Sequence, residues 1–166
     1  KDVTIQQLRE EGFKAFYVAI GAQGGRKAGV PGEDADGVKT GVEFLRSVNL
    51  DESTKLSGRT VVVGGGNVAV DVARAALRAG SGEVSMFCLE SRDIMPAAKD
   101  EVAEAEEEGI SVNNSWGPKE ILTENGKVKA IVFKKCLSVK DADGRFNPQY
   151  DENDLMTVEC ENVLLS

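Results

Sequence analysis

We predict an α/β fold with a parallel central sheet and an added antiparallel β-meander, from three observations. Strand-like and helix-like patterns alternate between residues 59 and 116, which is typical of parallel strands joined by crossover helices. The first of these strands meets three consecutive glycines, Gly64 to Gly66, before a helix begins. After Gly117-Pro118 the hydrophobic period changes to two, which indicates antiparallel strands. Together these features predict a Rossmann-like three-layer domain.

The first 50 residues predict a helix, a strand, a loop and a second helix. Residues 4–12, TIQQLREEG, form a helical segment that ends in a glycine. Residues 14–22, KAFYVAIGA, predict a buried strand. Residues 23–38 are rich in Gly, Pro and Asp and predict a loop with a turn at Pro31-Gly32. The apolar spacing within 38–50 predicts the second helix.

The alternating region supplies the parallel sheet. Its predicted elements are a strand at 60–63, a helix at about 67–79, a strand at 83–89, a helix within 98–109 and a short strand within 110–116. Such a β-α-β-α-β series places the helices over the sheet that its strands form.

The remaining third predicts mainly strands. Residues 119–139 predict a hairpin around Asn125-Gly126, which is a strong turn signal. Residues 141–154 form a polar excursion, and residues 155–166 predict a further pair of short strands. The last of them, 162–165, is apolar enough to return to the central sheet.

Composition and charge exclude several classes of function. The 166 residues carry a net charge of −8, which argues against nucleic acid or an anionic membrane as the main partner. The chain has no histidine, which removes His-dependent nucleophile sites and most transition-metal sites, so we expect no bound metal. No apolar run reaches about 18 residues, and no signal peptide is recognised, so we expect a cytoplasmic protein. Cys88, Cys136 and Cys160 lie far apart and predict buried free thiols.

The stretch Gly64–Ala69 matches G-x-G-x-x-A, a form of the fingerprint that binds the pyrophosphate of a dinucleotide. Gly64 permits a tight turn, Gly66 lets the backbone approach a phosphate, and Ala69 lets the helix pack closely on the sheet. The helix N-terminus adds free N–H groups and a partial positive charge. A P-loop is excluded because no Gly-Lys-Ser/Thr follows. A turn that binds nothing and an S-adenosylmethionine site stay open, although the β-rich segment that follows argues against the second.

Longer stretches carry a family resemblance. They are YVAIGAQGGRKAGVPGEDADGV, VVVGGGNVAVDVARAALRAG, SRDIMPA, AEAEEEGI and DADGRFNPQYDEND. In order and spacing they resemble the small (beta) subunit of glutamate synthase and its relatives, which are FAD-dependent pyridine nucleotide oxidoreductases. The resemblance implies that residues 1–58 are a remnant of an FAD domain with a connecting hinge and helix, and that 59–166 form the NAD(P)H-binding domain. The chain is therefore expected to be a fragment whose partners are the FAD domain and iron–sulfur segment of one longer protein.

The resemblance also implies residue roles. The residues expected to hold the pyrophosphate are Gly64, Gly65, Gly66, Asn67, Val68 and Ala69. Asp71 matches an acid that lies near the nicotinamide in related flavin reductases, or it is an ordinary first-turn acid that the helix dipole favours. No residue of this chain is required as a catalytic acid or base, since the cofactors carry the chemistry.

Glu90, Ser91 and Arg92 are the second set of expected cofactor-binding residues. Many members of the family carry Arg-Arg-Ser-Arg here, and those arginines bind the 2′-phosphate of NADPH. Glu90 would instead accept hydrogen bonds from ribose hydroxyls and repel a 2′-phosphate, so NADH is favoured over NADPH. Alternatives stay open, in which Arg92 stacks on adenine or reaches a phosphate, or Glu90 points to solvent.

The expected function is to position reduced nicotinamide for hydride transfer to FAD, which regions outside this chain mainly bind. The isolated chain should bind nucleotide without turnover. A glutamate synthase large subunit or another electron-accepting subunit would be a further partner. The alternatives are a non-catalytic nucleotide-binding module, acting as a sensor or scaffold, and a purely structural interaction module.

Overall fold

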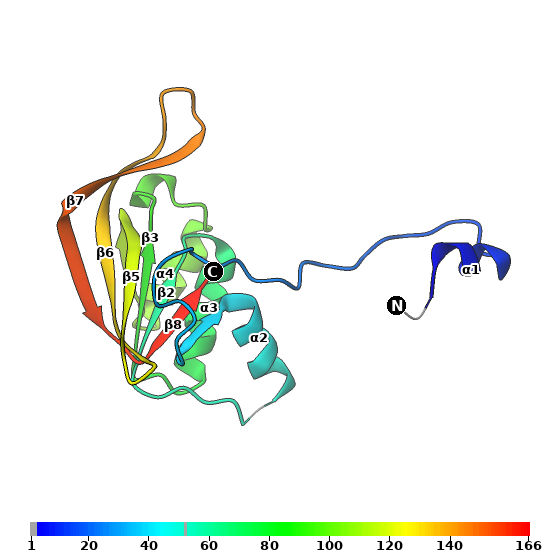
Figure 1. Cartoon of the computed structure of the whole chain (residues 1–166), viewed down its shortest axis with the longest axis horizontal. Helices are drawn as coiled ribbons and strands as arrows, with labels where there is room; N and C mark the ends of the chain where they lie inside the picture. The colour runs from blue at the N-terminus through cyan, green and yellow to red at the C-terminus, as the bar shows by residue number, and fades with distance from the viewer. Residues whose placement is uncertain (1–2, 52) are drawn as a thin grey trace.

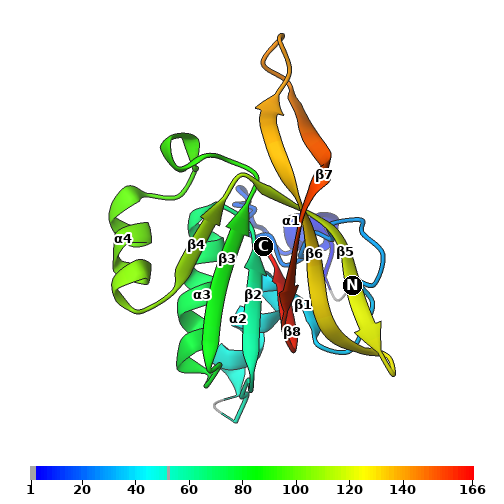
Figure 2. The same cartoon turned by 90° about the vertical axis from the view of Figure 1, so that its left-hand side faces the viewer.

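A computed structural model describes residues 3–51 and 53–166, and most of them form three layers. The middle layer is a parallel sheet of five strands in the order β1-β8-β2-β3-β4. Its strands are β1 (Val38–Thr40), β2 (Arg59–Val63), β3 (Glu83–Cys88), β4 (Ser111–Asn114) and β8 (Asn162–Leu165). Helices cover one face and an antiparallel sheet covers the other (Figure 1 and Figure 2). The predicted fold class is confirmed.

The two outer layers follow the predicted order. The helices are α2 (Gly41–Leu50), α3 (Asn67–Arg78) and α4 (Lys99–Glu107), with a short 3-10 helix, η1 (Arg92–Ile94), before α4. The antiparallel sheet has the order β5-β6-β7, with β5 (Trp116–Glu124), β6 (Lys127–Lys140) and β7 (Phe146–Glu159). The predicted elements between residues 59 and 116 are confirmed to within two residues at each end.

The two cores arise from the alternation of side chains along the parallel strands. In β8, Leu164 packs into the core under the helices, whereas Val163 belongs to the core under the antiparallel sheet. Neighbouring strands repeat this division. On the second side, the rings of Phe87 and Phe133 stack with centroids 4.2 Å apart and an interplanar angle of 12°. This stack joins β3 to β6 and fixes the antiparallel sheet against the central one.

The N-terminal segment differs from the prediction. Residues 4–12 contain α1 (Ile5–Glu10), as expected, but residues 14–22 form no strand. Tyr17 is 94% exposed and Ile20 is 78% exposed, and no strand of the described residues pairs with this segment. An unpaired strand is unstable in water, so the apolar pattern alone does not produce one. Figure 1 shows α1 and the following segment extending away from the three layers.

Two further strands were not predicted where they occur. Residues 38–40 form β1 rather than the start of a helix, because they pair in parallel with β8, and α2 begins only after Thr40 caps it. Residues 141–154, expected as a polar excursion, contain only a short turn before β7 begins at Phe146. Although β1 and α2 lie within residues 1–58, they belong to the same sheet and the same helix layer as the elements of residues 59–166. The boundary between an FAD-domain remnant and a nucleotide-binding domain at residue 58 stays a prediction.

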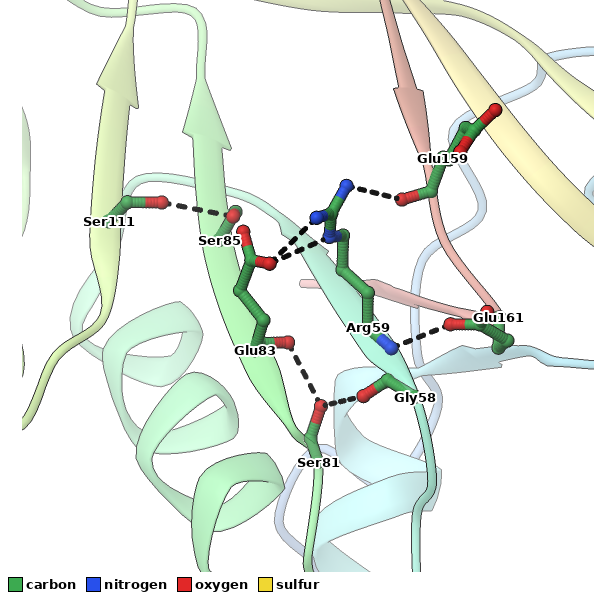
Figure 3. Close-up of polar contacts among 8 residues, drawn as sticks. All are labelled: Gly58, Arg59, Ser81, Glu83, Ser85, Ser111, Glu159 and Glu161. Atoms are coloured by element: carbon green, nitrogen blue, oxygen red, sulfur yellow. Dashed lines mark hydrogen bonds and ion pairs between the residues drawn. The ribbon is translucent and has the colours of Figure 1, made fainter.

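Polar contacts join the strands at the amino end of the sheet, opposite the glycine turn (Figure 3). The Arg59 guanidinium lies 2.7 Å from a carboxylate oxygen of Glu83 on β3. The Arg59 backbone N–H donates to the Glu161 carboxylate at 2.6 Å, and its side chain donates to the Glu159 carbonyl at 3.3 Å. These contacts hold the chain between β7 and β8 against β2.

The remaining expectations concern membranes and thiols. Among the helices of the described residues, none has both the length and the apolar character that crossing a bilayer requires. Cys88, Cys136 and Cys160 are buried free thiols, as predicted. Burial first, and the charge of Glu90 second, raise the pKa of the Cys88 thiol to about 11, so this thiol stays protonated at neutral pH.

Candidate functional site

The glycine turn lies where the order of strand connections reverses. From β2 the chain continues to β3 and β4 on one side, whereas β8 and β1 lie on the other side of β2. In open α/β sheets, ligands bind outside the carboxyl ends of the strands at such a reversal. A cleft of about 640 Å³ opens at this edge. Its lining includes Gly64 and Gly65 of the turn, Glu90 after β3 and Ser166 after β8.

Gly64 occupies a position that only glycine fits. Its φ is +149°, and a Cβ there would lie 2.5 Å from the carbonyl oxygen of Ser166. The same Cβ would lie 3.2 Å from the Cβ of Ala69, which is itself 1% exposed. The turn therefore brings the end of β2, the end of β8 and the start of α3 into close contact, and this contact requires both small residues.

Gly66 differs because it faces open space. It is the N-cap of α3 and supplies no side-chain cap. Apart from its chain neighbours and its own helix, no heavy atom of the described residues lies within 4 Å of the position that a Gly66 Cβ would take. The first N–H groups of a helix lack intrahelical partners and attract anions. An anionic group can therefore approach this backbone closely, and the turn fits a pyrophosphate.

The Glu90 side chain lies against the glycine turn. Its Oε2 is 2.9 Å from the position of a Gly65 Cβ, so the carboxylate lies beside the turn and is partly buried. Its backbone carbonyl accepts hydrogen bonds from the Ser115 N–H at 3.0 Å and from the Asn114 side-chain amide at 3.2 Å. The end of β4 thus fixes the residue that follows β3.

Arg92 is directed toward α4. Its Nη1 donates to Oε1 of Glu106 at 2.8 Å, and its Nη2 donates to Oε2 at 2.6 Å. This is a bidentate ion pair, the geometry in which a guanidinium binds a carboxylate most strongly. Ser91 is exposed and precedes η1. The sequence could not predict the partner of Arg92, because 14 residues separate the pair and α4 carries several acids.

The other candidate residues lie along the first turns of α3. Asn67 Oδ1 accepts a hydrogen bond from the Ala98 N–H at 2.8 Å, so it also holds the start of α4. Val68 is 51% exposed, and Asp71 is exposed on the same helix. The Ala97 N–H donates to the Gly65 carbonyl at 3.0 Å. The segment between η1 and α4 is therefore tied to the glycine turn at two points.

One wall of the cleft was missed from the sequence. It comes from the antiparallel sheet and includes Trp116, Phe146, Pro148 and Tyr150. Two of its aromatic residues, Phe146 and Tyr150, fall in the stretch that was expected to be a polar excursion. The signal that could have revealed them is the pair of aromatic residues itself, since they alternate with polar residues as in a strand.

Comparison with known proteins identifies relatives of the whole chain. The family described as pyridine nucleotide-disulphide oxidoreductase matches residues 1–146. The NADP(+)-dependent formate dehydrogenase subunit beta of Moorella thermoacetica is 41% identical over 154 residues, which cover 89% of this chain and 21% of that protein. The small chain of glutamate synthase [NADPH] from Halomonas elongata is 29% identical over 176 residues, covering 100% of this chain and 37% of that protein.

A solved structure has the same fold as this chain. Mycobacterium tuberculosis FprA in complex with NADPH superposes with a TM-score of 0.74 at 21% sequence identity. The alignment covers 89% of this chain and 48% of FprA. The chain therefore spans less than half the length of each of these three proteins.

Proposed function

The chain belongs to the pyridine nucleotide-disulphide oxidoreductase family, and from this premise we propose that it is the NAD(P)H-binding domain of a flavin-dependent oxidoreductase. The observation that carries the proposal is the glycine turn at the reversal of strand order, with open space in front of Gly66 at the N-terminus of α3. The resemblance to the glutamate synthase small chain extends over the whole chain and supports the same assignment.

The residues of the chain fit the parts of a dinucleotide. The N-terminus of α3 would bind the pyrophosphate through backbone N–H groups, and Gly66 would permit its close approach. The Glu90 carboxylate would accept hydrogen bonds from the adenosine ribose, since it lies beside Gly65 at the end of β3. A bound reduced nicotinamide would supply the hydride, and FAD, held mainly outside this chain, would accept it. Asp71 remains a candidate for the nicotinamide side, one turn into α3.

We propose further that the domain favours NADH over NADPH. A carboxylate at position 90 repels a 2′-phosphate, and Arg92, the nearest arginine in sequence, is paired with Glu106. The relatives described above are named for NADP cofactors. The family resemblance implies arginines that bind a 2′-phosphate at two positions where this chain has Leu89 and Glu90. The residues of this chain therefore favour the opposite preference.

We also propose that the domain acts within a larger assembly. The two curated relatives described above are a formate dehydrogenase beta subunit and a glutamate synthase small chain. An FAD domain, an iron–sulfur segment and an electron-accepting subunit, such as a glutamate synthase large subunit, are the corresponding partners of this chain. By itself the chain would bind nucleotide without turnover.

A calorimetric titration of the chain with NADH and with NADPH, at one ionic strength, tests the proposal. We expect NADH to bind more tightly, and the Glu90→Arg variant to reverse the order, because it exchanges a repulsion for a charge-assisted hydrogen bond. The reversal should correspond to about 3–5 kcal/mol in relative binding free energy.

The matched control is Glu107→Arg, which makes the same change in net charge at an exposed position of α4. We expect it to leave the order of the two affinities unchanged. Tighter binding of NADPH to the unaltered chain would contradict the proposed preference, and binding of neither nucleotide would contradict the proposed function itself.

A further inference from the structure

The ion pair between Arg92 and Glu106 sits beside the residues proposed to contact the ribose. Arg92 follows Glu90 by two residues and begins η1. The segment after η1 is bound to the glycine turn through the Ala97 N–H and the Gly65 carbonyl, 3.0 Å apart. Arg92 therefore lies in the segment after β3, and in dinucleotide-binding folds an arginine near this acidic position accommodates the 2′-phosphate of NADP.

The ion pair with Glu106 occupies one edge of the Arg92 guanidinium. Nη1 and Nη2 each donate to a different oxygen of the Glu106 carboxylate, at 2.8 and 2.6 Å. A guanidinium has five N–H donors along two bidentate edges, and Glu106 occupies the edge that Nη1 and Nη2 of Arg92 form. A phosphate could bind this edge of Arg92 only by displacing Glu106, and the negative charge of the displaced Glu106 carboxylate would remain nearby.

Glu104 of α4 and Glu108, the C-cap of this helix, have different partners. Glu104 lies 3.1 Å from the guanidinium of Arg74, and Glu108 lies 2.6 Å from it. Glu108 also contacts Arg78 at 2.9 Å. Both of these arginines come from α3, so their pairs tie α4 to α3. The pair formed by Glu106 differs, because it reaches the segment that follows β3.

We propose that Glu106 is a specificity-determining positioning residue, which holds the Arg92 guanidinium in a bidentate pair and withholds it from the 2′-phosphate of NADPH. The inference rests on the proposed nucleotide site. It adds a second source of discrimination to the direct repulsion by Glu90, and this source lies on α4, which contributes no residue to the lining of the cleft.

The Glu106→Gln variant tests this role. It keeps the size of the side chain but removes the charge that retains the guanidinium. We expect the dissociation constant of NADPH to fall about fivefold, while that of NADH changes by less than about twofold. Adenosine 2′,5′-bisphosphate and 5′-AMP, which differ only in the 2′-phosphate, should show the same difference.

Two further variants separate the mechanism from a general charge effect. Glu107→Gln removes an equal charge from the next residue of α4 and should change the NADPH-to-NADH ratio by less than about twofold. Adding Arg92→Gln to Glu106→Gln should abolish the gain in NADPH affinity, because the freed guanidinium is then absent.

The outcomes distinguish the inference from the function on which it rests. A gain that is specific to the 2′-phosphate and is lost with Arg92→Gln supports it. Nucleotide binding without a change of the ratio in Glu106→Gln, or an equal gain in Glu107→Gln, would overturn the inference and leave the proposed function intact. Absence of binding of any of the four ligands by the unaltered chain would overturn both.

Discussion

Replacing Gly64 by alanine should lower the stability of the fold, whereas replacing Gly66 should weaken nucleotide binding, although the two residues lie in one turn. At Gly64 the new Cβ would lie 2.5 Å from the Ser166 carbonyl oxygen, and real Cβ contacts do not fall below about 3 Å. The backbone must therefore shift at the junction of β2 and β8, with additional strain from a φ of +149°. We expect Gly64→Ala to lower the free energy of unfolding by about 2–4 kcal/mol.

Gly66→Ala should leave the fold nearly intact. Its Cβ meets open space among the described residues, and the φ of −92° is accessible to any residue. We expect a loss below about 1 kcal/mol, from the poorer helix N-cap. The affinity for NADH should nevertheless fall at least about tenfold, because the methyl group occupies the approach of the pyrophosphate.

Urea unfolding followed by circular dichroism measures the first effect, and calorimetry with NADH measures the second. In a thermal melt, Gly64→Ala should lower Tm by about 5–15 °C. Gly82→Ala, at the opposite end of the sheet, is the control, since its Cβ would find an ordinary contact 3.6 Å away. Equal stability of the two turn variants, or unaltered NADH binding by Gly66→Ala, would refute the assignment of distinct roles to these glycines.

Two other predictions concern the core and the thiols. Phe133→Ala should lower the free energy of unfolding by about 3–5 kcal/mol in urea titrations, because Phe133 is fully buried and stacks on Phe87; a loss below about 1 kcal/mol would show that the antiparallel sheet is held by other contacts. The pKa of Cys88 is raised to about 11 and that of Cys160 to about 12, chiefly by burial, from 9.0. Because both pKa values are raised in the folded state, the stability that the two thiols contribute is complete below pH 9 and is lost as the pH rises from about 9 through 11 and 12. The free energy of unfolding should therefore fall over this pH range, and it should fall less in a variant that carries both Cys88→Ala and Cys160→Ala.

Local patterns were sufficient for the part of the fold that forms the glycine turn. Strand β2, the three glycines and helix α3 are consecutive, and their order and spacing determine the turn. The strand pairings that were missed depend on distant partners. Val38 of β1 pairs with Val163 of β8, and nothing in the first 50 residues specifies that partner. Residues 14–22 show the converse, since an apolar run without a partner in the described chain forms no strand.

The site was predictable to the same degree. The place of Glu90 near the glycine turn could be anticipated because it lies two residues after β3, and the structure places its carboxylate beside Gly65, while its role with a ribose stays a prediction. The role of Arg92 could not be deduced, since it depends on which acid of α4 meets η1 in three dimensions. The aromatic wall of the cleft was missed for a related reason, because Phe146 and Tyr150 lie on a strand that forms by pairing with β6, within a stretch of mainly polar residues.

The disagreement between the names of the relatives and the residues of this chain has a specific physical meaning. Cofactor preference depends on a difference of affinities, which a repulsive group changes as effectively as an attractive one. Here Glu90 lies beside the glycine turn, and a second acid, Glu106, forms a bidentate ion pair with Arg92, two residues after Glu90. If both act as proposed, Glu106→Gln alone should reduce the preference for NADH only in part, whereas Glu90→Arg alone should reverse it. The variant that combines Glu90→Arg with Glu106→Gln should then favour NADPH more strongly than Glu90→Arg, because two guanidinium groups become available to the 2′-phosphate.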